Sequence, residues 1–215
     1  MSVEREDHQE ESQEAPVRRR SRLFCGAIAV PVAFLGLGVY RAWIEIMFVG
    51  SFVDFPAVAF SGRDLFDLTM VVTAVACTLL ARRIGPFFDK PAVYALCAAT
   101  LTASTVLMFA SCWLPGIAPA VGVPATLLGG FGIALLILFW SELYGCLNPL
   151  RVALYYSASI VVGALVLYVY RGFMLPWLFV MTSLLPAASL VLLRRGFGSL
   201  PTAELPSTSW TRFSV

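Results

Sequence analysis

Six runs of apolar residues alternate along the chain with short polar segments. Each run approaches or exceeds the roughly 17 to 25 residues that an α-helix needs to cross a bilayer. The separators, such as "RRIGPFFDKP" and "GCLNPLR", contain the glycine, proline and charged residues that end helices. The pattern therefore predicts an all-α membrane protein with six transmembrane helices, at residues 23–48, 65–80, 92–114, 121–144, 152–170 and 175–193.

The composition supports a location in a membrane. Hydrophobic residues make up 59% of the 215 residues, charged residues only 13%, and the mean hydropathy is +0.83. Soluble domains contain about 25% charged residues, and a soluble fold with so few would expose large apolar patches. We therefore expect an integral membrane protein whose first partner is the lipid bilayer.

The distribution of Lys and Arg predicts the orientation. With a cytoplasmic N-terminus, the cytoplasmic segments contain all but three of the fifteen basic residues, and the outer side contains Arg41, Arg63 and Arg171. The sequence thus predicts an inner (plasma) membrane protein with both termini in the cytoplasm. Residues 1–22 form a disordered tail in this interpretation, residues 23–195 form the membrane domain, and residues 196–215 form a cytoplasmic tail or linker.

Two segments resemble each other. "GLGVYRAWIEIMFVG" at residues 36–50 and "GGFGIALLILFWSELYG" at residues 129–145 each place glycines before a W-x-E motif, Trp43 with Glu45 and Trp140 with Glu142. The segments lie in the first and fourth predicted helices, which cross the membrane in opposite directions. This pattern is typical of an inverted repeat of three plus three helices.

Arg41 and Glu45 are opposite charges one helical turn apart in a very apolar segment, where they share a helix face and can pair. In one interpretation the first helix has already crossed the membrane at Tyr40, so that Tyr40 and Trp43 form an interfacial aromatic belt and the charges are hydrated. In the other, the charges line an outward-facing cavity for an anionic or zwitterionic ligand, because charges at membrane depth usually face a cavity or partner.

Two further carboxylates also allow two interpretations. Glu142 is either an interfacial acid near Arg151 or a protonatable group in a transport path. Asp67 either interacts favourably with the N-terminal dipole of the second helix or faces the cavity. The candidate ligand-binding residues are accordingly Arg41, Trp43, Glu45, Asp67, Trp140 and Glu142.

Signatures of catalysis are missing from the sequence. The only histidine, His8, lies in the polar tail, and the five cysteines occur singly without C-x-x-C spacing. No G-x-S-x-G motif and no phosphate-binding G-K-[ST] loop occur. We expect neither an enzyme, nor a metal site, nor a cofactor.

The short basic loop "ARRIGPFFDK" after the second helix, with Arg83 and Gly85 in an R-x-G element, and the six-helix plan resemble one half of a major facilitator transporter. More narrowly, "GLGVYRAWIEIMF", "GGFGIALLILFWSELYG" and the final "LLRRGF" resemble the membrane portion of bacterial LuxR-type transcriptional regulators. These regulators carry a major-facilitator-like membrane region ahead of a helix-turn-helix domain. The resemblance covers roughly residues 23–215.

The resemblance implies a membrane-embedded sensor half that binds an unknown small molecule and works with a second six-helix half. Such a regulator continues with six more helices and a DNA-binding domain, so we expect no nucleic-acid binding through this chain. Its basic clusters suit the cytoplasmic side of the membrane better than DNA phosphates. Two alternatives stay open: a half-size transporter that acts as a homodimer, and a nonfunctional truncated remnant.

Overall fold

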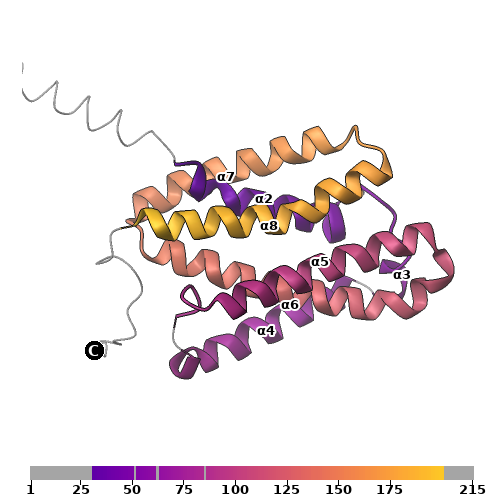
Figure 1. Cartoon of the computed structure of the whole chain (residues 1–215), viewed down its shortest axis with the longest axis horizontal. Helices are drawn as coiled ribbons and strands as arrows, with labels where there is room; N and C mark the ends of the chain where they lie inside the picture. Colours follow the sequence, from indigo (N-terminus) through magenta and orange to yellow (C-terminus); the bar gives the residue numbers. More distant parts are fainter. Residues whose placement is uncertain (1–30, 51, 62, 85, 201–215) are drawn as a thin grey trace, which may run out of the picture. The chain divides into compact units, whose positions relative to one another are not determined.

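The computed structural model describes residues 31–50, 52–61, 63–84 and 86–200, and the helices belong to one compact unit that starts at Val32 (Figure 1). The predictions for residues 1–22, for the start of the first helix and for residues 201–215 lie outside the described residues. All regular structure in the described ranges is helical. The elements are η1 (Val32–Leu35), α2 (Gly36–Ile44), η2 (Glu45–Val49), α3 (Val58–Ser61), α4 (Arg63–Ile84), α5 (Pro91–Trp113), η3 (Pro115–Ile117), α6 (Ala118–Gly145), α7 (Pro149–Tyr170) and α8 (Leu175–Ser199).

The predicted all-α architecture is confirmed, and each predicted apolar run corresponds to one helix or continuous helical segment. The first run corresponds to η1, α2 and the π-helical turn η2, which follow one another without a break. α8 continues past Arg195, where the tail was expected to begin, because Gly196 and Phe197 are buried against the bundle. The short helices α3 and η3 were not predicted, since they lie in the connections.

Among the described residues, five helical segments are long and apolar enough to cross a membrane, which is consistent with a multi-pass membrane protein. α4 is not one of them. Its uncharged run between Asp67 and Arg82 is shorter than the roughly 17 residues that a span needs. A sixth span at α4 therefore stays a prediction. The five segments are Val32–Val49, Pro91–Trp113, Pro115–Gly145, Pro149–Tyr170 and Leu175–Ser199.

Local sequence explains where the helices begin. Pro91 and Pro149 stand at the first positions of α5 and α7, where a helix needs no N–H donor. The side chain of Asn148 accepts the backbone N–H of Leu150 at 3.1 Å and so caps α7. The predicted turn segments "RRIGPFFDKP" and "GCLNPLR" thus act as helix boundaries.

The long helices pack in two groups of three, and one of these groups brings together helices from both ends of the described chain (Figure 1). α2 packs against α7 and α8, whereas α6 packs against α4 and α5. Contacts of α5 and α6 with α8 join the two groups. The first helical segment of the described residues is thus a partner of the last two described helices, and α6 is a partner of α4 and α5, which precede it.

Glycines permit the closest approach between α2 and α7. A Cβ atom on Gly38 would collide with the carbonyl oxygen of Ser159 and come within 2.9 Å of the nitrogen of Gly163. Small residues commonly allow such close packing of helices in membranes. In the other group, a Cβ atom on Gly130 of α6 would lie 2.8 Å from the carbonyl oxygen of Phe66 in α4.

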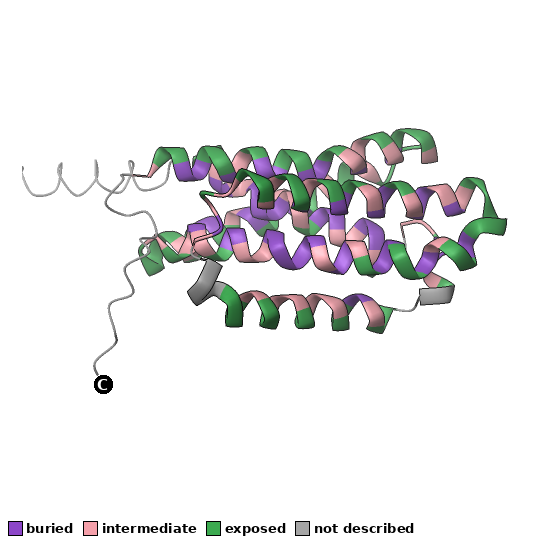
Figure 2. Cartoon of the chain, turned by 60° about the horizontal axis from the view of Figure 1, so that its bottom comes forward, coloured by how far each residue is buried: buried purple, intermediate pink, exposed green. Residues whose placement is uncertain are grey.

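The core runs along α6. This helix has the largest buried share of the five candidate spans, 56%, and α7 has the smallest, 17%. Figure 2 shows that the residues facing the inside of the bundle are buried and that the residues facing outward are exposed. The exposed side chains of α4 and α7 include many Leu and Val residues, as expected for surfaces in contact with lipid or another apolar partner.

Candidate functional site

The two tryptophans of the W-x-E motifs are buried in the bundle. Trp43 is fully buried, and its indole N–H donates to Oγ1 of Thr105 on α5 at 2.9 Å. Trp140 is 1% exposed, and its indole N–H donates to Oγ of Ser189 on α8 at 3.1 Å. Both bonds cross between the two helix groups, so both tryptophans hold the bundle together.

Glu142, two residues after Trp140, binds the segment that leads into α5. Its two carboxylate oxygens accept the backbone N–H groups of Phe87 and Phe88 at 2.9 and 3.0 Å. Charge-assisted bonds of this kind are stronger than bonds between neutral groups. Through these two bonds Glu142 holds the segment before α5, and both interpretations of Glu142 stay predictions.

The Phe88 ring continues this connection to the end of α8. It stacks on the ring of Phe197 with a centroid distance of 4.9 Å. A pocket of about 440 Å³ lies beside the stack, and Tyr94 and Arg194 are among its lining residues. The end of α6 is therefore linked through the 87–88 segment to the last turns of α8.

Glu45 begins the π-helical turn Glu45–Val49. The turn closes with a bond from the backbone N–H of Gly50 to the carbonyl oxygen of Glu45, 2.6 Å long. Single π-turns are rare and often occur at functional sites, because the extra residue per turn changes the direction of the side chains. This turn was not predicted from the sequence.

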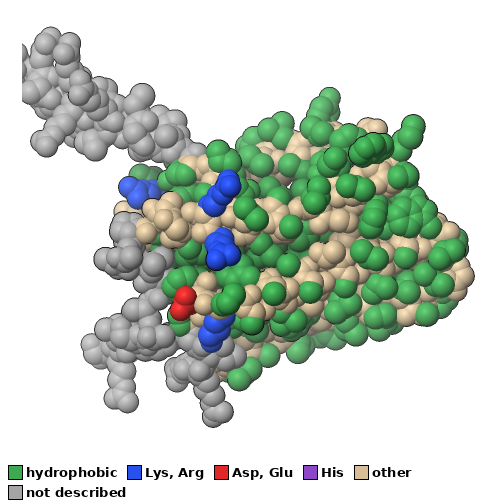
Figure 3. Space-filling model, viewed as in Figure 1, with side chains coloured by type: hydrophobic (Ala, Val, Ile, Leu, Met, Phe, Trp, Pro, Cys, Tyr) green, Lys and Arg blue, Asp and Glu red, His purple; other side chains and the backbone are tan. Residues whose placement is uncertain are grey.

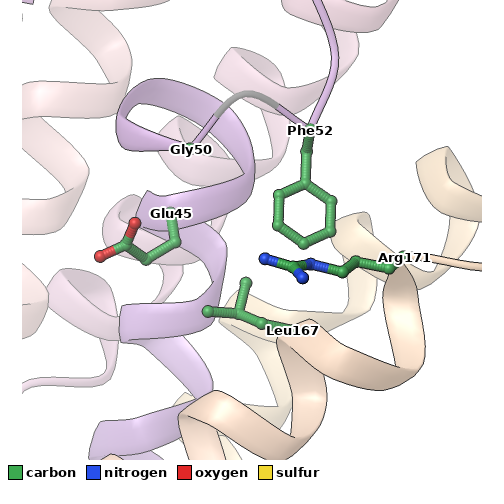
Figure 4. A pocket seen from close by; sticks show the side chains of 5 residues that line it. All are labelled: Glu45, Gly50, Phe52, Leu167 and Arg171. Atoms are coloured by element: carbon green, nitrogen blue, oxygen red, sulfur yellow. The ribbon is translucent and has the colours of Figure 1, made fainter.

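A pocket of about 540 Å³ lies beside this turn (Figure 4). The guanidinium of Arg171 extends below the ring of Phe52, 6.0 Å from its centroid, in a cation–π arrangement. Figure 4 shows the Glu45 carboxylate turned away from the guanidinium, so the two charges do not face each other. Among the described residues, the pocket is lined by Glu45, Gly50, Phe52, Leu167 and Arg171.

The other two candidate residues, Arg41 and Asp67, lie away from the pocket beside Glu45. Arg41 and Asp67 are exposed on α2 and α4, and neither lines the pocket beside Glu45. Within the described residues, Arg41 and Glu45 form no ion pair with each other, although their spacing would allow it. The ligand contacts predicted for Arg41 and Asp67 remain predictions.

Sequence reasoning did not propose Arg171 or Phe52 for the site. Arg171 was noticed only as one of three outer basic residues, and Phe52 lies in a connection without periodicity. The one available signal was that a basic residue on the outer side is unusual in this chain. Among the described residues, no group of three or more His, Cys, Asp or Glu side chains is placed to hold a metal ion.

No protein-family model, curated protein or solved structure matches this chain.

Proposed function

We propose that this chain is the membrane-embedded sensor half of a LuxR-type regulator, built as one half of a major-facilitator-like fold. In this proposal α4 also crosses the membrane, as the second of six spans in chain order, and the six spans form two inverted repeats. The packing pattern supports the repeat. If α2, α4 and α5 correspond to α6, α7 and α8 in that order, the contacts of α2 with α7 and α8 correspond to the contacts of α6 with α4 and α5, and both sets of contacts are present.

The hydrogen bonds of the two tryptophans also correspond between the two proposed repeats. Trp43 joins the first span to the third, and Trp140 joins the fourth span to the sixth. The two W-x-E motifs thus occupy corresponding places in the proposed repeats. Their glutamates lie at opposite ends of the bundle, because Glu45 lies near the turn before α8 and Glu142 is linked to the end of α8.

The observation that carries the sensor proposal is the connection between Glu142, Phe88 and Phe197. A sensor must pass a change in its membrane region to the segment that follows its last span. The Glu142 bonds and the Phe88–Phe197 stack join α6 to the end of α8, which leads into residues 200–215. A ligand in the Glu45 pocket would act at the other end of the same helices.

We further propose that the chain lies in the inner membrane with both termini in the cytoplasm. On the face shown in Figure 3, Lys and Arg side chains gather at the end of the bundle where α8 ends. Lys90, Arg151, Arg194 and Arg195 belong to the segments proposed to be cytoplasmic. Such an excess of basic residues is typical of cytoplasmic loops.

The first experiment is to sequence the transcript downstream of the Val215 codon through several hundred codons. We expect six further helices and a helix-turn-helix domain, in frame or just out of frame. The coding sequence of an unrelated protein there would contradict the regulator proposal, unless another polypeptide supplies the DNA-binding output.

A half-size transporter that acts as a homodimer is the second candidate. The small buried share of α7, 17%, leaves an apolar surface that a second copy could cover. The native mass of the full chain in a mild detergent tests this candidate, because it requires a dimer. A monomer at all concentrations would contradict it.

A further inference from the structure

We propose that the pocket beside Glu45 binds a small zwitterion, a molecule that carries an ammonium group and a carboxylate. Glu45 would accept the N–H donors of the ammonium, and Arg171 would bind the carboxylate. This inference rests on the proposed ligand-binding function and names the chemical class of the ligand.

Glu142 shows how the glutamate of a W-x-E motif is used in this fold. Its carboxylate accepts two neighbouring N–H donors, those of Phe87 and Phe88, from a segment between two helices. Glu45 has the corresponding position in its own motif, and within the described residues its side chain accepts no hydrogen bond. Its carboxylate is therefore available to N–H donors from outside the chain.

The backbone around Glu45 supports a binding role independently. The π-helical turn starts at Glu45 and closes at Gly50, and both residues line the pocket. A Cβ atom on Gly50 would lie 2.6 Å from the carbonyl oxygen of Glu45, so a larger residue would disturb this turn. A charged side chain and an unusual helical turn thus occur at the same residue, Glu45, which lines the pocket.

Arg171 supplies the opposite charge. Its guanidinium is held below Phe52 and forms no ion pair with Glu45 in the described part of the chain. Because the charges are separate, a ligand can meet both without first breaking an ion pair. A guanidinium matches a carboxylate with two parallel N–H donors, which favours a carboxylate over a halide at this point.

The pocket is also the right size for such a ligand. Its volume of about 540 Å³ falls within the roughly 300–1,000 Å³ of small-molecule sites. Leu167 and Phe52 provide apolar surface for the uncharged part of the ligand. A simple anion would be repelled by Glu45 and a simple cation by Arg171, so a molecule with both charges fits best.

The test uses the full chain in lipid nanodiscs and the twenty free L-amino acids as probes. We expect at least one to raise the melting temperature at saturation by roughly 5–10 °C. Its N-acetyl derivative, which lacks the ammonium, and its amide, which lacks the carboxylate, should each bind about tenfold to a hundredfold more weakly. Equal shifts from either blocked derivative, or no shift from any amino acid, would overturn the inference.

Matched variants locate the site. Glu45→Gln and Arg171→Gln should each weaken binding of the amino acid by a similar factor. Arg151→Gln, which removes a charge outside the pocket, should bind it like the wild type. Glu45→Asp keeps the charge and should recover part of the affinity, which separates a binding defect from misfolding. Wild-type binding by Glu45→Gln would overturn the assignment.

Failure of this inference and failure of the proposed function give different results. The coding sequence beyond Val215 tests the regulator without any ligand. If it encodes the second half and the DNA-binding domain while no amino acid shifts the melting temperature, only the zwitterion is wrong. If an amino acid binds but that coding sequence is absent, only the regulator is wrong.

Discussion

The indole N–H of Trp43 and the hydroxyl of Thr105 meet at 2.9 Å in the buried centre of the bundle. The Thr105 hydroxyl in turn donates to the carbonyl oxygen of Leu101, one turn earlier on α5. Each polar atom is therefore satisfied, and the pair ties α2 to the other helix group. A water molecule has no access to either fully buried side chain.

Replacing Thr105 by valine should lower the free energy of unfolding by about 1 kcal/mol or more. Valine has nearly the same shape, but it leaves the Trp43 indole N–H buried without an acceptor. Thermal unfolding of the full chain in detergent measures the change.

Thr182→Val is the matched control for this prediction. Thr182 is also fully buried, but its hydroxyl has no hydrogen-bond partner among the described residues. Removing that hydroxyl should leave the stability unchanged or raise it. Equal losses in both variants would mean that the Trp43–Thr105 bond contributes nothing specific.

Gly38→Ala should destabilise the chain by about 1–3 kcal/mol, because the new methyl group forces α2 away from the Ser159 carbonyl on α7. Gly198→Ala serves as its control, since a Cβ there meets nothing within 4 Å. The control should be neutral or gain up to about 1 kcal/mol from better helix propensity. Chemical unfolding measures the free energy of unfolding of both variants. An unchanged value for Gly38→Ala would show that the two helices can move apart at no cost.

Glu142→Gln should release the segment before α5. The glutamine amide offers one oxygen, so only one of the Phe87 and Phe88 N–H groups keeps its acceptor. Hydrogen exchange at these two amides should become about tenfold faster or more, since a bond to a charged group contributes about 1.5–3 kcal/mol. Ser141→Ala, a change at the exposed neighbouring position, should leave the exchange as it is. Wild-type exchange in Glu142→Gln would show that other contacts hold the segment.

The proposed orientation makes a separate prediction. Alkaline phosphatase, which is active only outside the cytoplasm, should be active when fused after Gly172 and inactive when fused after Val215. Green fluorescent protein fused after Val215 should fluoresce. The opposite pattern would invert the orientation and place the Glu45 pocket on the cytoplasmic side.

Hydropathy predicted the helices well because a helix that is buried in lipid or protein needs a long apolar run, whichever helices it packs against. It could not show which helices pack together: the partners of α2 are α7 and α8, far away in the sequence. The closely packed glycines, Gly38 and Gly163, were recognisable as small residues, but only the structure pairs them.

The candidate site was predicted only in part. Glu45 stood out because a carboxylate in an apolar segment is unusual, and it does line a pocket. Arg171 could not be paired with it from the sequence, because the two residues meet only after the helices have packed. The tryptophans were chosen for their type and proximity to the glutamates, but their position in the bundle interior follows from the packing of all six helices.

The pairing of α2 with α7 and α8 also determines when the chain can fold during its synthesis. The ribosome adds roughly 5–20 residues per second, so the first helical segment must wait on the order of ten seconds for its partners. During this interval the Trp43 side chain can bind Thr105, but the small residues around Gly38 have nothing to pack against. The first span therefore enters the membrane as an incomplete structure, which insertion factors or lipid must shield until the last helix has been made.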